Sequence, residues 1–330
     1  MSTSNAVARL SAEGVSVWLE AGDAGTPDQG LVRRLLAAGQ ITGLDLAQAD
    51  IGHDDAVDVA RWACDLLLPE YERTGGRDGL VTLPSTVGSA AGRVADTAAH
   101  VRAARYLARE TGRPNLLVSV PATVAGVAAI APLLAEGTGV QAGPVFSMQR
   151  YHQVAAAHLA GLEQARRRGL DLSAIASTAA FRVSPMDMEV DKLLDRAGSD
   201  ESKALRGRAA LAGARLAHRV FAETYDVRTR PEWRALAEAG ARPQRLLWTD
   251  AYDRIPGRRA TRYVEELVAP GTITALPAAA LEQVAARARI TGARAHREYE
   301  CADRLFGYLQ WFGIRYDDVV QDLERGYAHA

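Results

Sequence analysis

Short apolar runs alternate along the chain with longer amphipathic stretches. Eight runs rich in apolar and β-branched residues are typical of strands buried on both faces. They cover residues 15–19, 41–46, 80–83, 116–120, 140–146, 175–181, 245–248 and 272–276. Between them, stretches such as 89–111 and 151–168 repeat apolar residues at helical spacing and end at Gly112 and Gly169, which suit helix C-caps. The stretch from 202 to about 224 predicts a further long helix.

Eight strands alternating with helices in one chain of 330 residues predict a (β/α)₈ barrel, formed as a single domain over residues 1–330. Two further helices, 299–312 and 317–327, are expected to pack outside the barrel, and the first of them could cover its mouth. The alternative is a doubly wound open sheet. That fold usually places a glycine-rich phosphate loop after its first strand, whereas here Glu20-Ala-Gly-Asp23 follows.

The composition of the chain excludes several classes of function and site. Hydrophobic residues make up 48% and charged residues 24%, with a formal net charge of −1, so we expect a globular protein without a nucleic-acid or membrane surface. No apolar run of about 18 residues and no signal-peptide pattern is visible, which predicts a cytoplasmic location. Cys64 and Cys301 are too few for a disulfide framework or a four-thiolate metal site.

The basic residues are unusual, because only Lys192 and Lys203 among 39 are lysines. An arginine- and alanine-rich composition is typical of GC-rich, actinobacterial-type genomes. His53, followed by Asp54 and Asp55, is interpreted as a helix start rather than a metal ligand. No metal-ligand spacing such as H-E-x-x-H appears, and we expect neither a metal nor a cofactor.

Eight sequence segments, found in one order, carry a resemblance to a known family. They are Ser16-Val-Trp-Leu19, Arg113-Pro-Asn-Leu116, Pro121-Ala-Thr123, Phe146-Ser147, Arg150-Tyr151, Glu189-Val-Asp-Lys192, Tyr263-Val-Glu-Glu-Leu267 and Phe312-Gly-Ile314. Together they resemble the transaldolase family, particularly its bacterial branch, from about residue 15 to 324. The resemblance implies a (β/α)₈ barrel. It also implies transfer of a three-carbon ketone unit through a Schiff base on a strand-4 lysine.

The position of that lysine is occupied by Ser119, within Asn115-Leu-Leu-Val-Ser-Val-Pro-Ala-Thr123. A hydroxyl group cannot form an imine, and neither lysine of this chain follows a predicted strand closely. Other family positions also differ: the acid of strand 1 becomes Glu20, the asparagine of strand 2 Ala47, the glutamate of strand 3 Pro84, and the phosphate-site serine and arginine Ala180 and Pro185. Ser147 is retained. The resemblance therefore implies a chain that is not a working transaldolase.

New polar residues stand at the same strand ends, where barrel enzymes carry their active sites. If Ser119 points inward, Val118 and Val120 point outward, and by the same alternation Arg182 faces the mouth. The candidate catalytic residues are Glu20, Asp45, Ser119 and Asp250. The candidate substrate-binding residues are Gln48, Gln141, Ser147, Arg182 and Arg254.

Two hypotheses fit this set. In the first, the protein is an enzyme in which Glu20 or Asp45 acts as a general acid or base, since neighbouring carboxylates raise one pKa toward neutrality. The two arginines would then hold an anionic or polar carbonyl, carboxylate or sugar-derived substrate in a lyase, isomerase, dehydratase or cyclase reaction, with specialised metabolism a possible setting. In the second, pairs such as Glu20–Arg182 and Asp250–Arg254 plug a disused cavity, and the protein is a pseudoenzyme that binds a ligand or partner protein. Residual aldolase chemistry on Lys192 is a third, weaker alternative. The sequence gives no signal for the oligomeric state.

Overall fold

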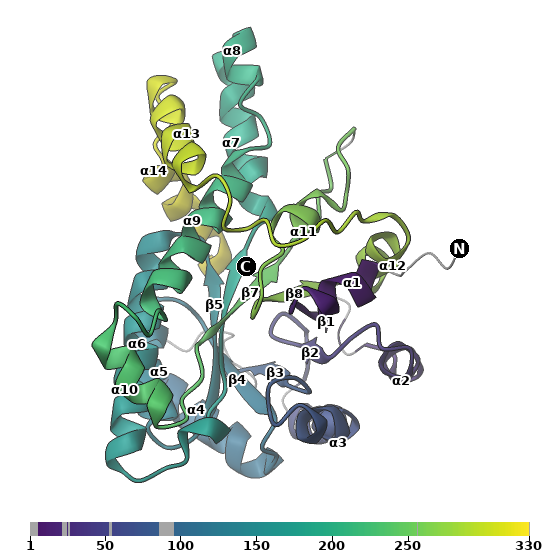
Figure 1. Ribbon diagram of the computed structural model, residues 1–330, viewed down its shortest axis with the longest axis vertical. Helices are drawn as coiled ribbons and strands as arrows, with labels where there is room; N and C mark the ends of the chain where they lie inside the picture. The colour runs from purple at the N-terminus through teal and green to yellow at the C-terminus, as the bar shows by residue number, and fades with distance from the viewer. Residues whose placement is uncertain are drawn as a thin grey trace.

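A closed barrel of eight parallel strands forms the centre of the protein in a computed structural model (Figure 1). Each strand pairs with its neighbours in chain order, and the last pairs with the first. The strands are β1 (Ser16–Glu20), β2 (Gly43–Asp45), β3 (Val81–Pro84), β4 (Leu116–Val120), β5 (Gly139–Val145), β6 (Ser177–Arg182), β7 (Arg245–Thr249) and β8 (Ile273–Leu276). The predicted (β/α)₈ architecture is confirmed. The structure describes residues 6–21, 25, 27–52, 55–85, 96–255 and 257–329.

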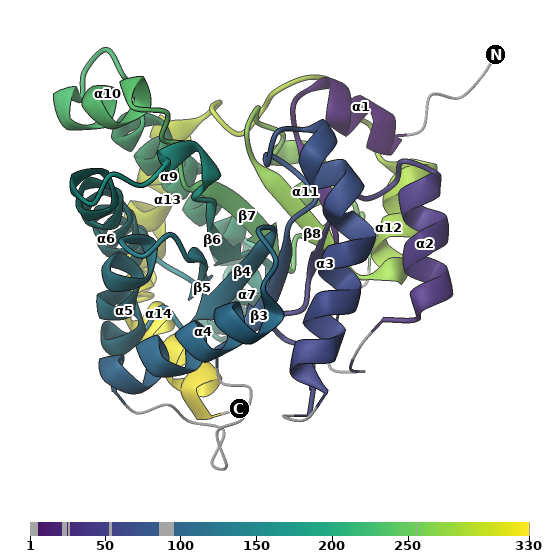
Figure 2. The same cartoon turned by 90° about the horizontal axis from the view of Figure 1, so that it is seen from below.

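Helices surround the barrel, as the view from below shows (Figure 2). They are α1 (Ala6–Ala12), α2 (Gln29–Ala37), α3 (Ala56–Arg73), α4 (Thr97–Thr111), α5 (Val124–Leu134), α6 (Met148–Arg167), α7 (Ser184–Ala197), α8 (Asp200–Lys203), α9 (Ala209–Thr224), α10 (Pro231–Glu238), α11 (Arg262–Glu266), α12 (Ala278–Arg287), α13 (Tyr299–Trp311) and α14 (Tyr316–His329). The two predicted C-terminal helices are α13 and α14. They pack against α9 and α7 respectively.

One predicted helix is wrong in extent. The stretch from 202 to 224 is not one helix but α8 and α9, separated at Gly207, whose φ of 72° lies in the left-handed region that ends helices. The amide of Gly207 donates to Asp191 Oδ1 at 2.8 Å, which holds the break in place. The predicted helix 89–111 corresponds to α4, which begins at Thr97 with Asp96 as its N-cap. The Asp96 side chain accepts a hydrogen bond from the Ala99 amide. The first residues of the predicted helix, like His53 and Asp54, lie outside the described part of the chain.

Strand alternation separates two hydrophobic clusters. Val118 and Val120 of β4 point outward into the layer between strands and helices, while Leu117 points into the barrel with Trp18 of β1. The Trp18 indole lies against Gly43 so closely that a Cβ there would stand 2.5 Å from its Nε1. Glycine at position 43 therefore makes room for the indole, which fills the barrel interior below the strand ends.

The N-terminal end of the barrel is closed by Arg245. Its guanidinium lies 3.2 Å from Asp78 Oδ1, donates to Ser16 Oγ at 2.5 Å and donates to the Gly271 carbonyl at 2.9 Å. Burial lowers the pKa of Arg245, and the Asp78 carboxylate opposes that shift. This end of the barrel is thus sealed by a satisfied ion pair.

Candidate functional site

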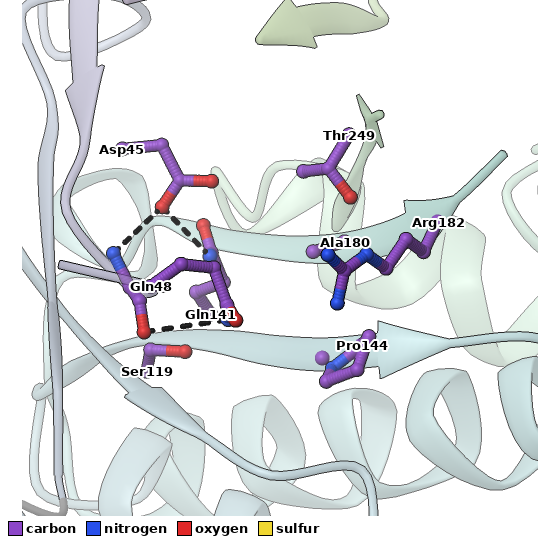
Figure 3. Close-up of a pocket in the computed structure, with 10 residues that line it drawn as sticks. Asp45, Gln48, Ser119, Gln141, Pro144, Ala180, Arg182 and Thr249 are labelled. Carbon is purple, nitrogen blue, oxygen red and sulfur yellow. Dashed lines mark hydrogen bonds between the residues drawn. The ribbon is translucent and has the colours of Figure 1, made fainter. Parts of the chain in front are cut away.

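A small cavity lies at the C-terminal ends of the strands (Figure 3). Its volume is about 10 Å³, room for about one water molecule. The residues that line it are Asp45, Ala47, Gln48, Ser119, Gln141, Gly143, Pro144, Ala180, Arg182 and Thr249. Five of the predicted site residues, Asp45, Gln48, Ser119, Gln141 and Arg182, are therefore brought together at one place.

Asp45 at the end of β2 is held through one of its two oxygens. Oδ1 accepts from Thr82 Oγ1 at 2.5 Å, from the Ala47 amide at 3.1 Å and from Gln141 Nε2 at 3.2 Å. Oδ2 receives no hydrogen bond from the described residues. Burial raises the pKa of Asp45, and the three donors act against that rise. One carboxylate oxygen is therefore fixed while the other is unengaged, in a side chain that lines the cavity.

Two threonines support this carboxylate from the layer below. Thr178 Oγ1 donates to Gln141 Oε1 at 3.1 Å, which leaves the amide nitrogen of Gln141 to face Asp45. The hydroxyl of Thr82 accepts from the Leu46 amide at 3.1 Å while it donates to Asp45. Sequence reasoning missed both threonines. Their position two residues before Pro84 and Ala180, on the same strand face, was the signal that could have found them.

Glu20 lies beside Asp45, because the two residues are partners in the β1–β2 register. Burial raises the pKa of Glu20 well above its usual value, and the charges of Asp45 and Asp250 raise it further, against the opposing effect of Arg182 and Arg254. Its carboxyl group forms no hydrogen bond with another described residue. The surroundings of Glu20 thus favour the protonated form of its carboxyl group.

Asp250 holds both predicted arginines. Its Oδ2 accepts from Arg182 Nε, and its Oδ1 lies 3.4 Å from Arg254 Nη2. Asp250 has a φ of 47°, which few residues other than glycine, asparagine and aspartate adopt. Among the two pairs expected for a plugged mouth, Asp250–Arg254 is present. Arg182 is paired with Asp250 rather than with Glu20.

A residue from the far end of the chain covers this group. Tyr327 on α14 donates its hydroxyl to Gln48 Oε1 at 2.8 Å, and its ring lies 5.6 Å from the Arg182 guanidinium carbon. The same ring packs edge-on against Phe146, with centroids 6.5 Å apart. The tail was expected outside the barrel, with 299–312 as the segment that could reach the mouth. The segment that reaches it is α14.

Several other candidates lie elsewhere. The Ser147 hydroxyl accepts from the Arg150 amide at 3.1 Å and so acts as N-cap of α6, and Ser147 does not line the cavity. Glu20, Asp250 and Arg254 surround the cavity without lining it. Lys192 and Lys203 are on α7 and α8, where each is about half exposed and paired with a helix neighbour, Glu189 and Asp200.

Within the described residues, no group of three or more histidine, cysteine, aspartate or glutamate side chains is placed to hold a metal ion. No helix in that same part of the chain is long and apolar enough to cross a membrane.

Comparison with known proteins shows which family the sequence is similar to. The family model described as transaldolase/fructose-6-phosphate aldolase matches residues 45–327. A transaldolase of Thermobifida fusca is 40% identical, with 96% of this chain and 91% of that protein covered. Transaldolase 1 of Streptomyces avermitilis is 38% identical, with 96% and 89% covered.

The chain belongs to the transaldolase family. The resemblance seen in its sequence is thereby confirmed, and the family match spans the strand ends that carry Asp45, Ser119, Gln141 and Arg182. In this transaldolase-family barrel, Ser119 of β4 is 8% exposed and faces the cavity.

Proposed function

We propose that this chain does not use imine chemistry and instead performs acid–base catalysis on a small polar or anionic carbonyl or carboxylate compound. The observation that carries the proposal is the pair of carboxyl groups at the ends of β1 and β2. Asp45 has one oxygen fixed by three donors and one unengaged, while Glu20 beside it has a strongly raised pKa. Burial raises the pKa of both groups, but only Asp45 has hydrogen-bond donors that favour its charged form, so Asp45 suits the base and Glu20 the acid.

In this mechanism Asp45 Oδ2 removes a proton from the carbon next to a carbonyl group. Glu20, whose raised pKa favours the protonated form, donates to the developing oxyanion or to a leaving group. Arg182 and Arg254 stabilise negative charge on the substrate, and Ser119 and Gln141 orient it. The names of the relatives, transaldolase, favour a small sugar-derived or sugar-phosphate substrate, which the two arginines also suit.

Solvent-deuterium exchange tests the acid–base step. Dihydroxyacetone phosphate, fructose 6-phosphate and pyruvate are incubated with the protein in D₂O and followed by proton NMR. We expect loss of the signal next to the carbonyl group of at least one compound, and a loss of rate of roughly 100-fold or more in Asp45→Asn and Glu20→Gln. Lys192→Ala is the matched control and keeps the wild-type rate. Exchange that persists in both carboxyl variants contradicts the proposal.

Borohydride trapping tests the absence of an imine. With fructose 6-phosphate and borohydride, we expect no gain in intact mass for this chain, because Ser119 has no amine and both lysines lie on the surface. The transaldolase of Thermobifida fusca, treated in parallel, is the positive control. A stable adduct on this chain, mapped to Lys192 or Lys203, would restore the aldolase alternative.

A pseudoenzyme is the second candidate. It is favoured by the cavity of about 10 Å³ and by the two arginines already engaged by Asp250. Its signature in the same experiments is an absence of exchange with every compound, together with a rise in melting temperature when one of them is added.

A further inference from the structure

We propose that the N-terminal face of the barrel carries a second binding site, for a flat apolar ligand with one anionic group. The site is an open depression of about 490 Å³ at the opposite end of the strands from Asp45. Among its lining residues, Gly14, Arg77, Pro243 and Gly271 lie in the segments that lead into β1, β3, β7 and β8. Its volume falls within the range of small-molecule sites, about 300–1,000 Å³.

The walls of this depression are largely apolar, with Arg77 as the charged lining residue. Phe221 from the last turns of α9 and Tyr225 just beyond them form one side, and Pro243 and Pro270 belong to the segments before β7 and β8. The Tyr225 hydroxyl is hydrogen-bonded to His158 Nδ1 at 3.1 Å, and its ring packs edge-on against Trp233 with centroids 4.9 Å apart. Because its polar atom is already used, Tyr225 offers carbon surface to a ligand.

The charge at this face favours an anion. Arg77 is exposed and donates to the Gly14 carbonyl at 3.1 Å, and Arg245 lies near enough for the Arg77 charge to lower its pKa. Arg242 donates to the Gly75 carbonyl in the same loop at 2.5 Å. Two acids neutralise part of this cluster: Asp78 pairs with Arg245, and the Arg242 charge acts on the exposed Asp171 carboxylate. Three guanidinium groups therefore stand against two carboxylates, and Arg77 is the one of the three that lines the depression, which favours an anionic ligand there.

Another acid borders the depression but faces elsewhere. Glu223 follows Ala222 on α9, and its charge acts on Arg219 and Tyr299. Arg219 forms an ion pair with Asp303 of α13, and Tyr299 is the first residue of α13. Its side chain is thus directed to the α9–α13 contact and not toward Arg77.

Fluorescence titration with 8-anilinonaphthalene-1-sulfonate tests the site, since this probe is aromatic, apolar and anionic. We expect saturable binding, and because Trp233 is one of five tryptophans and lies against Tyr225, Trp233→Phe reduces the energy transfer to the bound probe without abolishing it. Arg77→Ala weakens binding about fivefold, the upper range for an exposed ion pair. Ala222→Trp, which fills the depression from an exposed helix position, abolishes binding. Circular dichroism melts verify that each variant is folded.

The controls separate the contribution of the Arg77 charge from nonspecific hydrophobic binding of the probe. Arg33→Ala removes an exposed arginine on α2 and leaves the affinity unchanged. The uncharged analogue N-phenyl-1-naphthylamine binds wild type and Arg77→Ala equally. Absence of saturable binding, or equal affinity of wild type and Ala222→Trp for the sulfonate, overturns the proposal.

Discussion

At the scale of single residues, the hydrogen bonds of Asp45 have a direction. Thr178 donates to Gln141, and Gln141 donates to Asp45. An amide can be turned either way and a hydroxyl can donate or accept, so the Asp45 carboxylate, which only accepts, sets the orientation of Gln141, and the Thr178 hydroxyl stabilises that orientation by donating to Oε1. Thr178 therefore acts as a positioning residue for Asp45, although it does not line the cavity.

Because Thr178 is linked to Asp45 through Gln141, replacing the Thr178 hydroxyl should change the pKa of Asp45. In Thr178→Val the Gln141 amide is no longer oriented, so its donation to Asp45 weakens and the pKa of Asp45 rises further. Thr178→Ser keeps the donor and the wild-type pKa. Carbon-13 NMR titration of the aspartate carboxyl groups measures both. An unchanged Asp45 pKa in Thr178→Val would contradict the relay.

Glu20 predicts a dependence of stability on pH. Its folded-state pKa is raised, so between about pH 4.3, its unfolded value, and that higher pKa the folded state holds a proton that the unfolded state has lost. The free energy of unfolding therefore falls as pH rises through this window. Glu20→Gln removes this fall, and we expect its melting temperature to exceed that of wild type at pH 8 and to match it near pH 4. In a chain of this size each kcal/mol corresponds to about 2 °C.

Calorimetry at the two pH values measures this difference. A Glu20→Gln variant that is less stable than wild type at pH 8 would show that the Glu20 carboxylate is paired and not repelled.

At the scale of elements, α14 closes the mouth with a single ring. Tyr327 contacts Gln48, Arg182 and Phe146, which come from the ends of β2, β6 and β5. Arg150 and Glu324, with side-chain atoms 3.4 Å apart, add an ion pair between α6 and α14. A substrate larger than water requires side chains around the cavity to move, and we expect the Tyr327 ring to be among them.

Tyr327→Ala tests the closure. We expect a loss of stability of about 1–2 kcal/mol, less than for a fully buried aromatic because Tyr327 is half-buried. We also expect phenol to raise the melting temperature of the variant and not of wild type. Tyr308→Ala on α13 removes an exposed tyrosine and serves as the control, within about 0.5 kcal/mol of wild type. A phenol effect of equal size on wild type and variant would show that the ring does not fill the mouth.

The elements also show where sequence reasoning stops. The strands were predictable because parallel strands covered by helices are continuous apolar runs, as in 116–120. The break between α8 and α9 was not, because Gly207 lies in an otherwise helical pattern and its conformation depends on Asp191, 16 residues away. Tyr327 was missed for the same reason. Its partners Gln48 and Arg182 are brought to it by the fold.

At the scale of the molecule, the barrel has two unlike ends. Strand order and alternation allowed the C-terminal end to be predicted, including the neighbouring positions of Glu20 and Asp45. The Asp250–Arg254 pair was expected from the sequence, but the pairing of Arg182 with Asp250 rather than with Glu20 was not, because it depends on how the loop after β7 folds. The depression at the N-terminal end also lay beyond prediction, since Arg77, Tyr225 and Pro270 share no local pattern.

The contact between the Trp18 indole and Gly43 limits how the cavity at the strand ends can be enlarged. The two positions fit each other in this chain, so a side chain at position 43 would require the Trp18 indole to shift or to be replaced by a smaller group. While the pair is kept, the barrel floor stays at one depth beneath Ala180. New room for a ligand is then more readily gained outward, toward α14, where Tyr327 meets Gln48 and Arg182.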